Sequence, residues 1–237
     1  IFYFPYYTYT LNERANQFFV TPGYRSRFGP YLLGTYRWFL SEQVDGELHT
    51  DYRWERGVGV GPDINLHLGR WGEATIGYYY LNDREPGTNS GGFNNPNDRQ
   101  RVQFNYDATP WTNLNLKSQV RYQSDERLLT DYFEGEYRRN PQAATFAEAN
   151  KLWDNFSLDL FAQPRVNDFF ETVEALPEMK LTGFRQEIGA SPFYYESESS
   201  AGYYRRRFAE TNSVPSGLDF EAARADTYHQ IVMPQTF

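Results

Sequence analysis

The stretch that decides the fold is residues 176–208, LPEMKLTGFRQEIGASPFYYESESSAGYYRRRF. Two segments rich in aromatic and β-branched residues, 173–181 and 192–208, flank a break that is bracketed by Gly183, Gly189 and Pro192. Strand-forming segments separated by such turn residues predict an antiparallel hairpin. The second segment is about three times as long as the usual globular strand of 5–6 residues. Strands of that length suit the tilted wall of a barrel.

Apolar and polar residues alternate along most of the remaining chain. Residues 48–56 place Leu48, Tyr52 and Trp54 on one face and charged or polar side chains on the other. Strict alternation predicts strands with one apolar face. Further extended segments are expected at 18–27, 31–40, 60–68, 74–81, 102–108, 114–122, 152–163 and 224–237. We predict roughly eleven strands joined mostly by single turns, and a short helix within residues 141–149.

The connections between the predicted strands differ in length. The long ones, 82–98 and 124–151, fall on the same side of the sheet when the strands are counted from the first. Short turns on one side and long loops on the other are typical of outer-membrane barrels. The glycine-rich stretch GVGVG at 57–61 resembles a phosphate loop, but no helical pattern follows it, so we predict a tight turn.

Composition narrows the class of protein. Aromatic residues make up 19% of the chain, although the mean hydropathy is -0.75. No apolar run approaches the ~18 residues of a spanning helix, which excludes a helical membrane protein. A hydrophilic average with many aromatics fits a transmembrane barrel, whose lipid-facing residues alternate with polar lumen residues. A soluble β-sandwich is the alternative, because it too has one apolar and one polar face. The net charge of -8 argues against nucleic acid as a partner.

The sequence offers few groups for catalysis. The three histidines lie on predicted strands without an evident third ligand, so we expect no metal site. Glu196 and Glu198 share one face as a glycosidase pair would, but we interpret them as an acidic lining. The run 205–207 of three arginines is either a phosphate or lipid-headgroup site or a strand end in polar surroundings. We expect no cofactor and no enzymatic activity, so function should come from shape, lumen polarity and strand edges.

Six motifs carry a family resemblance. They are, in chain order, IFYFPYYTY, SRFGPYL, RGVGVGPDINL, LPEMKL, FYYESESSAGYYRRRF and ARADTYHQIVMPQTF. Together they resemble the barrel of the LPS-assembly outer-membrane proteins, the LptD (OstA) family. The resemblance implies a Gram-negative outer-membrane translocon that inserts lipopolysaccharide into the outer leaflet without chemistry on it. The implied partners are lipopolysaccharide, an LptE-like lipoprotein plug, a periplasmic lipopolysaccharide-transport bridge and outer-membrane lipid. A general porin or transporter barrel and a soluble carbohydrate-binding or hydrolytic β-protein stay open as alternatives.

The resemblance also implies a domain plan. Residues 1–17 would lead in from an upstream periplasmic domain, and residues 18–237 would form the N-terminal part of the barrel. In the family the first and last strands part to release the lipid. We therefore predict a lateral seam at Pro22, Gly23 and Pro30, because proline and glycine remove or weaken ladder hydrogen bonds. The polar faces would line the lumen, and the residues predicted to do so are Asp51, Arg53, Lys117, Arg121, Glu196 and Glu198.

Overall fold

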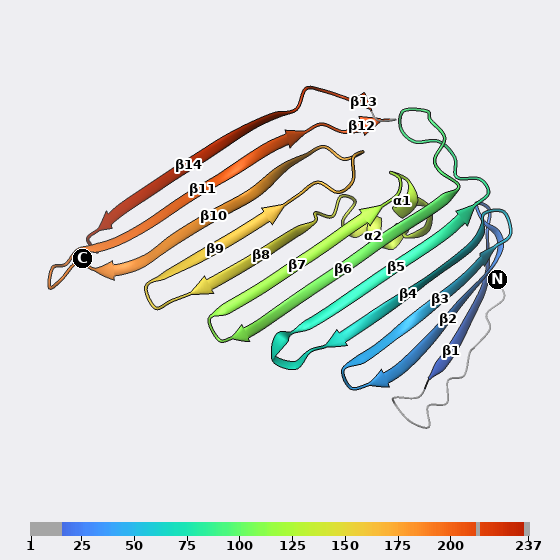
Figure 1. Cartoon of the computed structure of the whole chain (residues 1–237), viewed down its shortest axis with the longest axis horizontal. Coiled ribbons are helices and arrows are strands. Elements are labelled where there is room, and N and C mark those ends of the chain that lie inside the picture. Colours follow the sequence, from blue (N-terminus) through green and yellow to red (C-terminus); the bar gives the residue numbers. More distant parts are fainter. Residues whose placement is uncertain (1–15, 212–213, 235–237) are drawn as a thin grey trace.

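The computed structural model describes residues 16–211 and 214–234, and twelve of its strands form one antiparallel sheet (Figure 1). The strands of this sheet are β1 (Gln17–Arg25), β2 (Gly29–Ser41), β3 (Val44–Arg53), β4 (Gly57–His67), β5 (Glu73–Asp83), β6 (Asp98–Trp111), β7 (Leu114–Gln123), β8 (Phe146–Leu152), β9 (Phe156–Gln163), β10 (Thr172–Glu187), β11 (Tyr194–Arg207) and β14 (Phe220–Val232). A separate short pair, β12 (Glu210–Thr211) and β13 (Val214–Pro215), lies in the link between β11 and β14.

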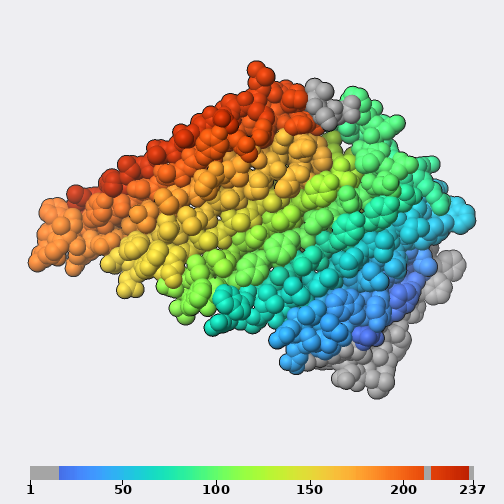
Figure 2. Space-filling view, viewed as in Figure 1, coloured from blue at the N-terminus to red at the C-terminus, as the bar shows by residue number. Residues whose placement is uncertain are grey.

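Each strand of the large sheet pairs with its neighbours along the chain, so the sheet is a meander. Figure 2 shows the strands as successive oblique bands from blue to red. In the described residues, β1 and β14 are the two outer strands and the sheet is open. The all-β antiparallel meander expected from the sequence is confirmed and is consistent with part of a barrel. The additional strand relative to the predicted eleven is β8.

The links at the two ends of the strands differ, as the sequence predicted. At one end, called the loop end below, lie the long links 84–97, 124–145, 164–171 and 208–219, together with the short links 26–28 and 54–56. At the opposite end, called the turn end, lie the short links 42–43, 68–72, 112–113, 153–155 and 188–193. The short 3-10 helix η1 (Gly69–Trp71) belongs to the turn end.

The link between β7 and β8 contains α1 (Leu128–Tyr132) and α2 (Glu134–Arg139). The prediction of a helix within 141–149 was wrong, because both helices lie before this range and residues 146–149 belong to β8. Two physical reasons favour the earlier position. Acidic residues in the first turn of α2 and arginines in its last turn complement the helix dipole. Pro141 then disfavours a helical conformation at the preceding Asn140.

The predicted tight turn at 57–61 was also wrong, because these residues form the start of β4. The turn lies just before them, at residues 54–56. The glycines instead allow the close approach of β5, since a Cβ on Gly57 or Gly61 would meet its backbone and one on Gly59 would meet a large side chain. A Cβ atom on Gly59 would lie 2.0 Å from the hydroxyl oxygen of Tyr79, so a side chain at position 59 would displace that tyrosine.

The register divides the sheet into two chemically different faces. One row across β3 to β7 reads Glu47, Asp63, Gly77, Gln103 and Arg121, and this side is called the polar face. The adjacent row on the other side, across β4 to β7, reads Ile64, Ile76, Phe104 and Val120, and this side is called the apolar face. Period-2 alternation along each strand produces both faces.

The apolar face is exposed and extends over most of the sheet. Exposed side chains on it include Val20 of β1 and Leu160 of β9. It becomes mixed at β11 and β14, where Ser199, Thr227 and His229 share this side with Tyr195 and Ile231. Within the described part of the chain, no helix has the length and apolarity needed to cross a membrane.

Candidate functional site

The residues predicted to form a seam lie together on β1 and β2. Gly23 pairs with Tyr31, and Pro30 pairs with Tyr24, the residue after Gly23. Pro22, one position earlier, stands opposite Leu32. The three residues therefore occupy one patch beside the open edge of the sheet. That they form a lateral seam stays a prediction.

The six residues predicted to line a lumen all lie on the polar face. The registers across β3 to β7 place Asp51 and Arg53 on the same side as Lys117 and Arg121. The registers across β7 to β11 extend this side to Glu196 and Glu198. Their surroundings differ, however. Glu198 forms an exposed ion pair with Lys180 at 2.9 Å, whereas Arg53 is only 6% exposed. Their lining role stays a prediction.

Arg53 is buried because the link containing α1 folds back over the polar face. Its guanidinium lies over the ring of Tyr132 in α1, with 4.9 Å to the ring centroid. It donates hydrogen bonds to Asp51 at 3.1 Å and to the Tyr79 hydroxyl at 3.0 Å. Tyr79 in turn donates to Asp51 at 2.7 Å. Asp51 and Arg53 thus belong to a closed hydrogen-bonded group under α1.

Beside this group lies a second set of buried charges, called the ionic cluster. It consists of Arg56, Asp83, Arg99, Asp125 and Asp131. Arg99 is fully buried and contacts all three aspartates: Asp125 at 2.5 and 2.9 Å, and Asp83 and Asp131 at 2.9 Å each. Arg56 binds Asp83 with two parallel hydrogen bonds of 2.7 and 2.8 Å. Such bidentate pairs fix geometry as well as charge.

The ionic cluster joins the folded link to the sheet. Asp83 and Arg99 come from β5 and β6, whereas Asp125 and Asp131 come from the link between β7 and β8. Arg27, from the link between β1 and β2, adds a further ion pair to Asp131 at 3.5 Å. With Arg56 from the link between β3 and β4, charges from five separate segments therefore meet at one point at the loop end of the polar face.

Aromatic residues of the folded link reinforce this attachment. Tyr132 donates a hydrogen bond of 2.7 Å to Asp83, and its ring stacks on Phe28 at 5.5 Å. Burial and this bond to a carboxylate raise the pKa of the Tyr132 phenol, so it stays protonated as a donor. Phe133 packs edge-on against Tyr79 at 5.2 Å. The link is held by charge, hydrogen bonding and ring packing together.

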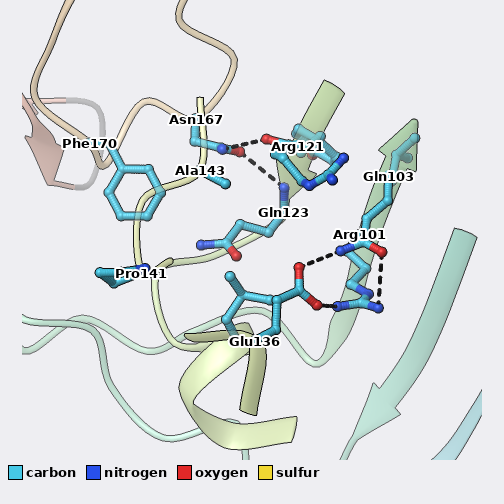
Figure 3. A pocket seen from close by; sticks show the side chains of 12 residues that line it. Arg101, Gln103, Arg121, Gln123, Glu136, Pro141, Ala143, Asn167 and Phe170 are labelled. Carbon is cyan, nitrogen blue, oxygen red and sulfur yellow. Dashed lines mark hydrogen bonds and ion pairs between the residues drawn. The ribbon is translucent and has the colours of Figure 1, made fainter. Parts of the chain in front are cut away.

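The helix α2 extends this contact toward β6. Glu136 accepts a hydrogen bond of 2.7 Å from Arg101 and a further one from Gln103 (Figure 3). The guanidinium of Arg101 lies over the ring of Phe133 at 3.4 Å from its centroid. The loop end of the polar face is consequently covered by protein, while its turn end is open.

The ionic cluster was not predicted from the sequence. Asp125, Asp131 and Arg99 lie at polar positions in a loop or next to one, where charges are normally solvated. A usable signal was the density of opposite charges in 124–131, SDERLLTD, beside two leucines. Leu128 from this run is fully buried.

The other candidate groups have ordinary structural partners. Arg205 and Arg207 both contact Glu174, at 3.0 and 3.2 Å, and Arg206 contacts Glu171 at 2.5 Å. The arginine run thus lies in polar surroundings at a strand end. His49 and His67 each contact an aspartate on a neighbouring strand. Among residues 16–211 and 214–234, no group of three or more His, Cys, Asp or Glu is arranged to hold a metal.

These features define a class of protein. An open antiparallel meander with one polar and one apolar face, long links at one end and short turns at the other, has the architecture of a segment of barrel wall.

Comparison with known proteins is more specific. The chain is 23% identical over 190 residues to the LPS-assembly protein LptD of Pseudoalteromonas translucida, covering 77% of this chain and 24% of that protein. It is 26% identical over 133 residues to LptD of Pseudomonas putida, covering 55% of this chain and 12% of that protein. No family model matches the chain. The resemblance to LptD noted in the sequence is confirmed as a distant similarity, and the chain spans about a quarter of the first relative's length.

Proposed function

We propose that this chain is part of the outer-membrane barrel of a lipopolysaccharide-assembly protein. The observation that carries the proposal is the similarity to LptD along 77% of the chain. The open twelve-strand meander supports it, because a quarter of a larger barrel protein would appear as such an unclosed wall. The similarity favours a transport protein rather than a catalyst.

The two faces of the sheet give this function a physical basis. The apolar face would contact the acyl chains of the bilayer, and the polar face would enclose a hydrated lumen for the saccharide part of the substrate. By the usual orientation of such barrels, the loop end would face outward and the turn end the periplasm. Residues 1–17 would lead in from a periplasmic domain, and residues 18–237 would form barrel.

The partners follow from the same proposal. Lipopolysaccharide would arrive from a periplasmic transport bridge at the turn end, where the polar face is open. An LptE-like lipoprotein plug would occupy the lumen and contact this open part of the polar face. Outer-membrane lipid would surround the apolar face.

Release of the lipid would occur at the seam beside β1. Pro22 in the edge strand β1 and Pro30 at the start of the adjacent β2 lack an amide proton, so each removes one possible ladder hydrogen bond. A backbone hydrogen bond is worth about 0.5–1.5 kcal/mol net, so a few missing bonds weaken the seam without unfolding it. The seam could then open sideways while the rest of the wall stays paired.

The test uses the full-length protein in living cells with a photo-crosslinking residue at Thr21, next to Pro22. Lipopolysaccharide adducts are expected at Thr21. The exchange Pro22→Val should strengthen the seam and reduce both the adduct and the lipopolysaccharide that reaches the cell surface. Pro62→Val is the matched control, because Pro62 lies within β4, away from the edge, opposite Leu48.

Unchanged surface lipopolysaccharide in Pro22→Val would contradict the seam. If Thr21 is unlabelled while position 121 on the polar face is labelled, lipid enters the lumen but leaves elsewhere. If neither position is labelled, a porin or a soluble β-protein becomes the better explanation, and single-channel conductance separates these two.

A further inference from the structure

The wall of the sheet contains a notch at the loop end, between β7 and β10. The two strands between them are short: β8 has 7 residues and β9 has 8, against 16 in β10 and 14 in β11. β7 pairs with β8 only from Leu114 to Gln119. Residues 120–123 of β7 therefore extend beyond their neighbour, and the links 124–145 and 164–171 fill the space.

Side chains from these links satisfy the exposed backbone of β7. The Thr145 hydroxyl accepts a hydrogen bond from the Arg121 amide at 3.0 Å. Asn167 accepts one from the Gln123 amide at 3.0 Å and donates one to the Arg121 carbonyl at 2.7 Å (Figure 3). The backbone in the notch is thus paired, and any unpaired polar group there belongs to a side chain.

Two adjoining cavities lie in the notch. The smaller measures about 20 Å³ and is lined by Arg121, Gln123 and α2, among others. The larger measures about 120 Å³ and lies between residues 142–145 and 163–172. The cavities share Ala143, Asn167 and Phe170 as lining residues. Since one water requires about 10–15 Å³, the larger cavity has room for several waters or one small polar group.

Arg121 brings an unbalanced positive charge to the notch. Its guanidinium donates to the Phe104 and Val120 carbonyls at 3.0 and 2.8 Å and to the Asn105 side chain at 2.6 Å. All of these acceptors are neutral, and none of the ion pairs found among the described residues includes Arg121. Glu136, the acid closest to it in the pocket, is already engaged by Arg101. The site therefore carries a net positive charge in a chain of net charge -8.

Gln123 adds an unused hydrogen-bond donor. Its side chain is buried, with 5% of the residue exposed, yet its Nε2 has no acceptor in the described structure. Figure 3 shows its carboxamide pointing into the pocket between Phe170 and Pro141. Buried donors in native proteins are nearly always paired, so an orphaned one indicates a missing acceptor.

We propose that the notch binds an anionic group carried on a sugar, either a phosphate or a carboxylate. Arg121 supplies the charge, Gln123 Nε2 and the Thr145 hydroxyl supply hydrogen bonds, and the amides of Gln142 and Gln163 at the larger cavity suit sugar hydroxyls. Glu171 also lines the larger cavity, but its carboxylate is held by Arg206 at 2.5 Å. This inference rests on the proposed function and adds a substrate subsite on the wall, distant from the seam.

The test is isothermal titration of the full-length detergent-solubilised protein with a phosphorylated glucosamine disaccharide, its dephosphorylated form and inorganic phosphate. The phosphorylated sugar should bind, and Arg121→Gln should weaken it by about tenfold or more, as expected for losing a charge-assisted bond. Gln123→Leu should weaken binding about threefold while leaving the thermal stability unchanged, because it removes an unpaired amide. Arg84→Gln is the control, since Arg84 likewise bonds to a neutral backbone carbonyl, that of Trp54.

Equal binding by wild type and Arg121→Gln would overturn the proposal, as would equal binding of the two sugar forms. Binding of inorganic phosphate without the sugar would show a free-phosphate site and overturn the saccharide assignment. Retained sugar binding with no lipopolysaccharide adduct at either Thr21 or position 121 would contradict the translocon, not the subsite. If the wild-type protein does not bind the phosphorylated sugar although cells with it carry normal surface lipopolysaccharide, only the subsite is contradicted.

Discussion

The two ends of the strands are held together by different forces. At the loop end, long links fold over the polar face and bury guanidinium and carboxylate groups from β3–β6 and the β7–β8 link. At the turn end, short links leave aromatic side chains such as Trp71 and Trp111 at the surface, 44% and 55% exposed. The former end depends on a unique arrangement of charges, whereas the latter depends on compact turns and ring contacts.

This difference indicates where substitutions should reduce the stability of the sheet most. Burying charges is costly, and a buried ion pair broken on one side leaves its partner unsatisfied. Exposed ion pairs and aromatic contacts lack this penalty, because water replaces the lost partner. Substitutions at the loop end should therefore cost more than chemically similar ones at the turn end.

The largest effect is expected for Arg99→Leu. This change leaves Asp83, Asp125 and Asp131 without their shared cation, and breaking a buried pair typically costs about 3–5 kcal/mol. Arg37→Leu is the matched control on the same face, because Arg37 is exposed and pairs with Glu47 at 2.6 Å. Its expected cost is about 0–1 kcal/mol. Urea unfolding of the full-length protein measures both, and equal losses would remove the distinction between the two ends.

A smaller effect is expected for Tyr132→Phe. The change removes the hydrogen bond to Asp83 but keeps the ring stacked on Phe28, so the loss should be about 1.5 kcal/mol, as for a bond to a charged group. Tyr137→Phe on the exposed side of α2 is the control and should change nothing measurable. Hydrogen exchange in residues 124–145 would show whether the link loosens locally, and unchanged protection there would contradict its attachment through Tyr132.

The smallest effect is expected at the turn end. Trp71 and Trp111 pack edge-to-face with 5.9 Å between ring centroids. A double-mutant cycle with Trp71→Ala and Trp111→Ala should give a coupling energy of about 0.5–1.5 kcal/mol. A coupling energy as large as the loss of unfolding free energy in Arg99→Leu would mean that aromatic contacts at the turn end stabilise the sheet as much as the ionic cluster does.

Alternation made most of the sheet predictable. The pattern in residues 48–56 places Asp51 and Arg53 on one face, and the structure confirms this placement. The end of the sheet at which the long links lie was equally predictable. Successive strands alternate in direction, so counting strands gives the end of each link. Both conclusions depend only on local periodicity and on counting strands.

The folded link could not be predicted in the same way. Asp125 and Asp131 have the local pattern of a solvated loop, and only contacts with Asp83 and Arg99, far away in the sequence, make them buried. The glycines at 57, 59 and 61 indicated a turn by composition, but they allow the close approach of β5: Gly59 leaves space for the Tyr79 side chain, and Gly57 and Gly61 lie against the β5 backbone. Tertiary contacts of this kind leave no periodic signal in the sequence.

The short strands β8 and β9 have a mechanical consequence for the surrounding lipid. A tilted strand needs about 9–11 residues to cross the hydrocarbon layer, whereas β8 and β9 have 7 and 8. In the proposed outer-membrane location, β8 and β9 are therefore too short to span the hydrocarbon layer, whereas β10 is longer than needed. Lipids respond to such mismatch by local thinning, at fractions of a kcal/mol per ångström. The membrane beside the notch would thus be thinner than the membrane around the rest of the wall.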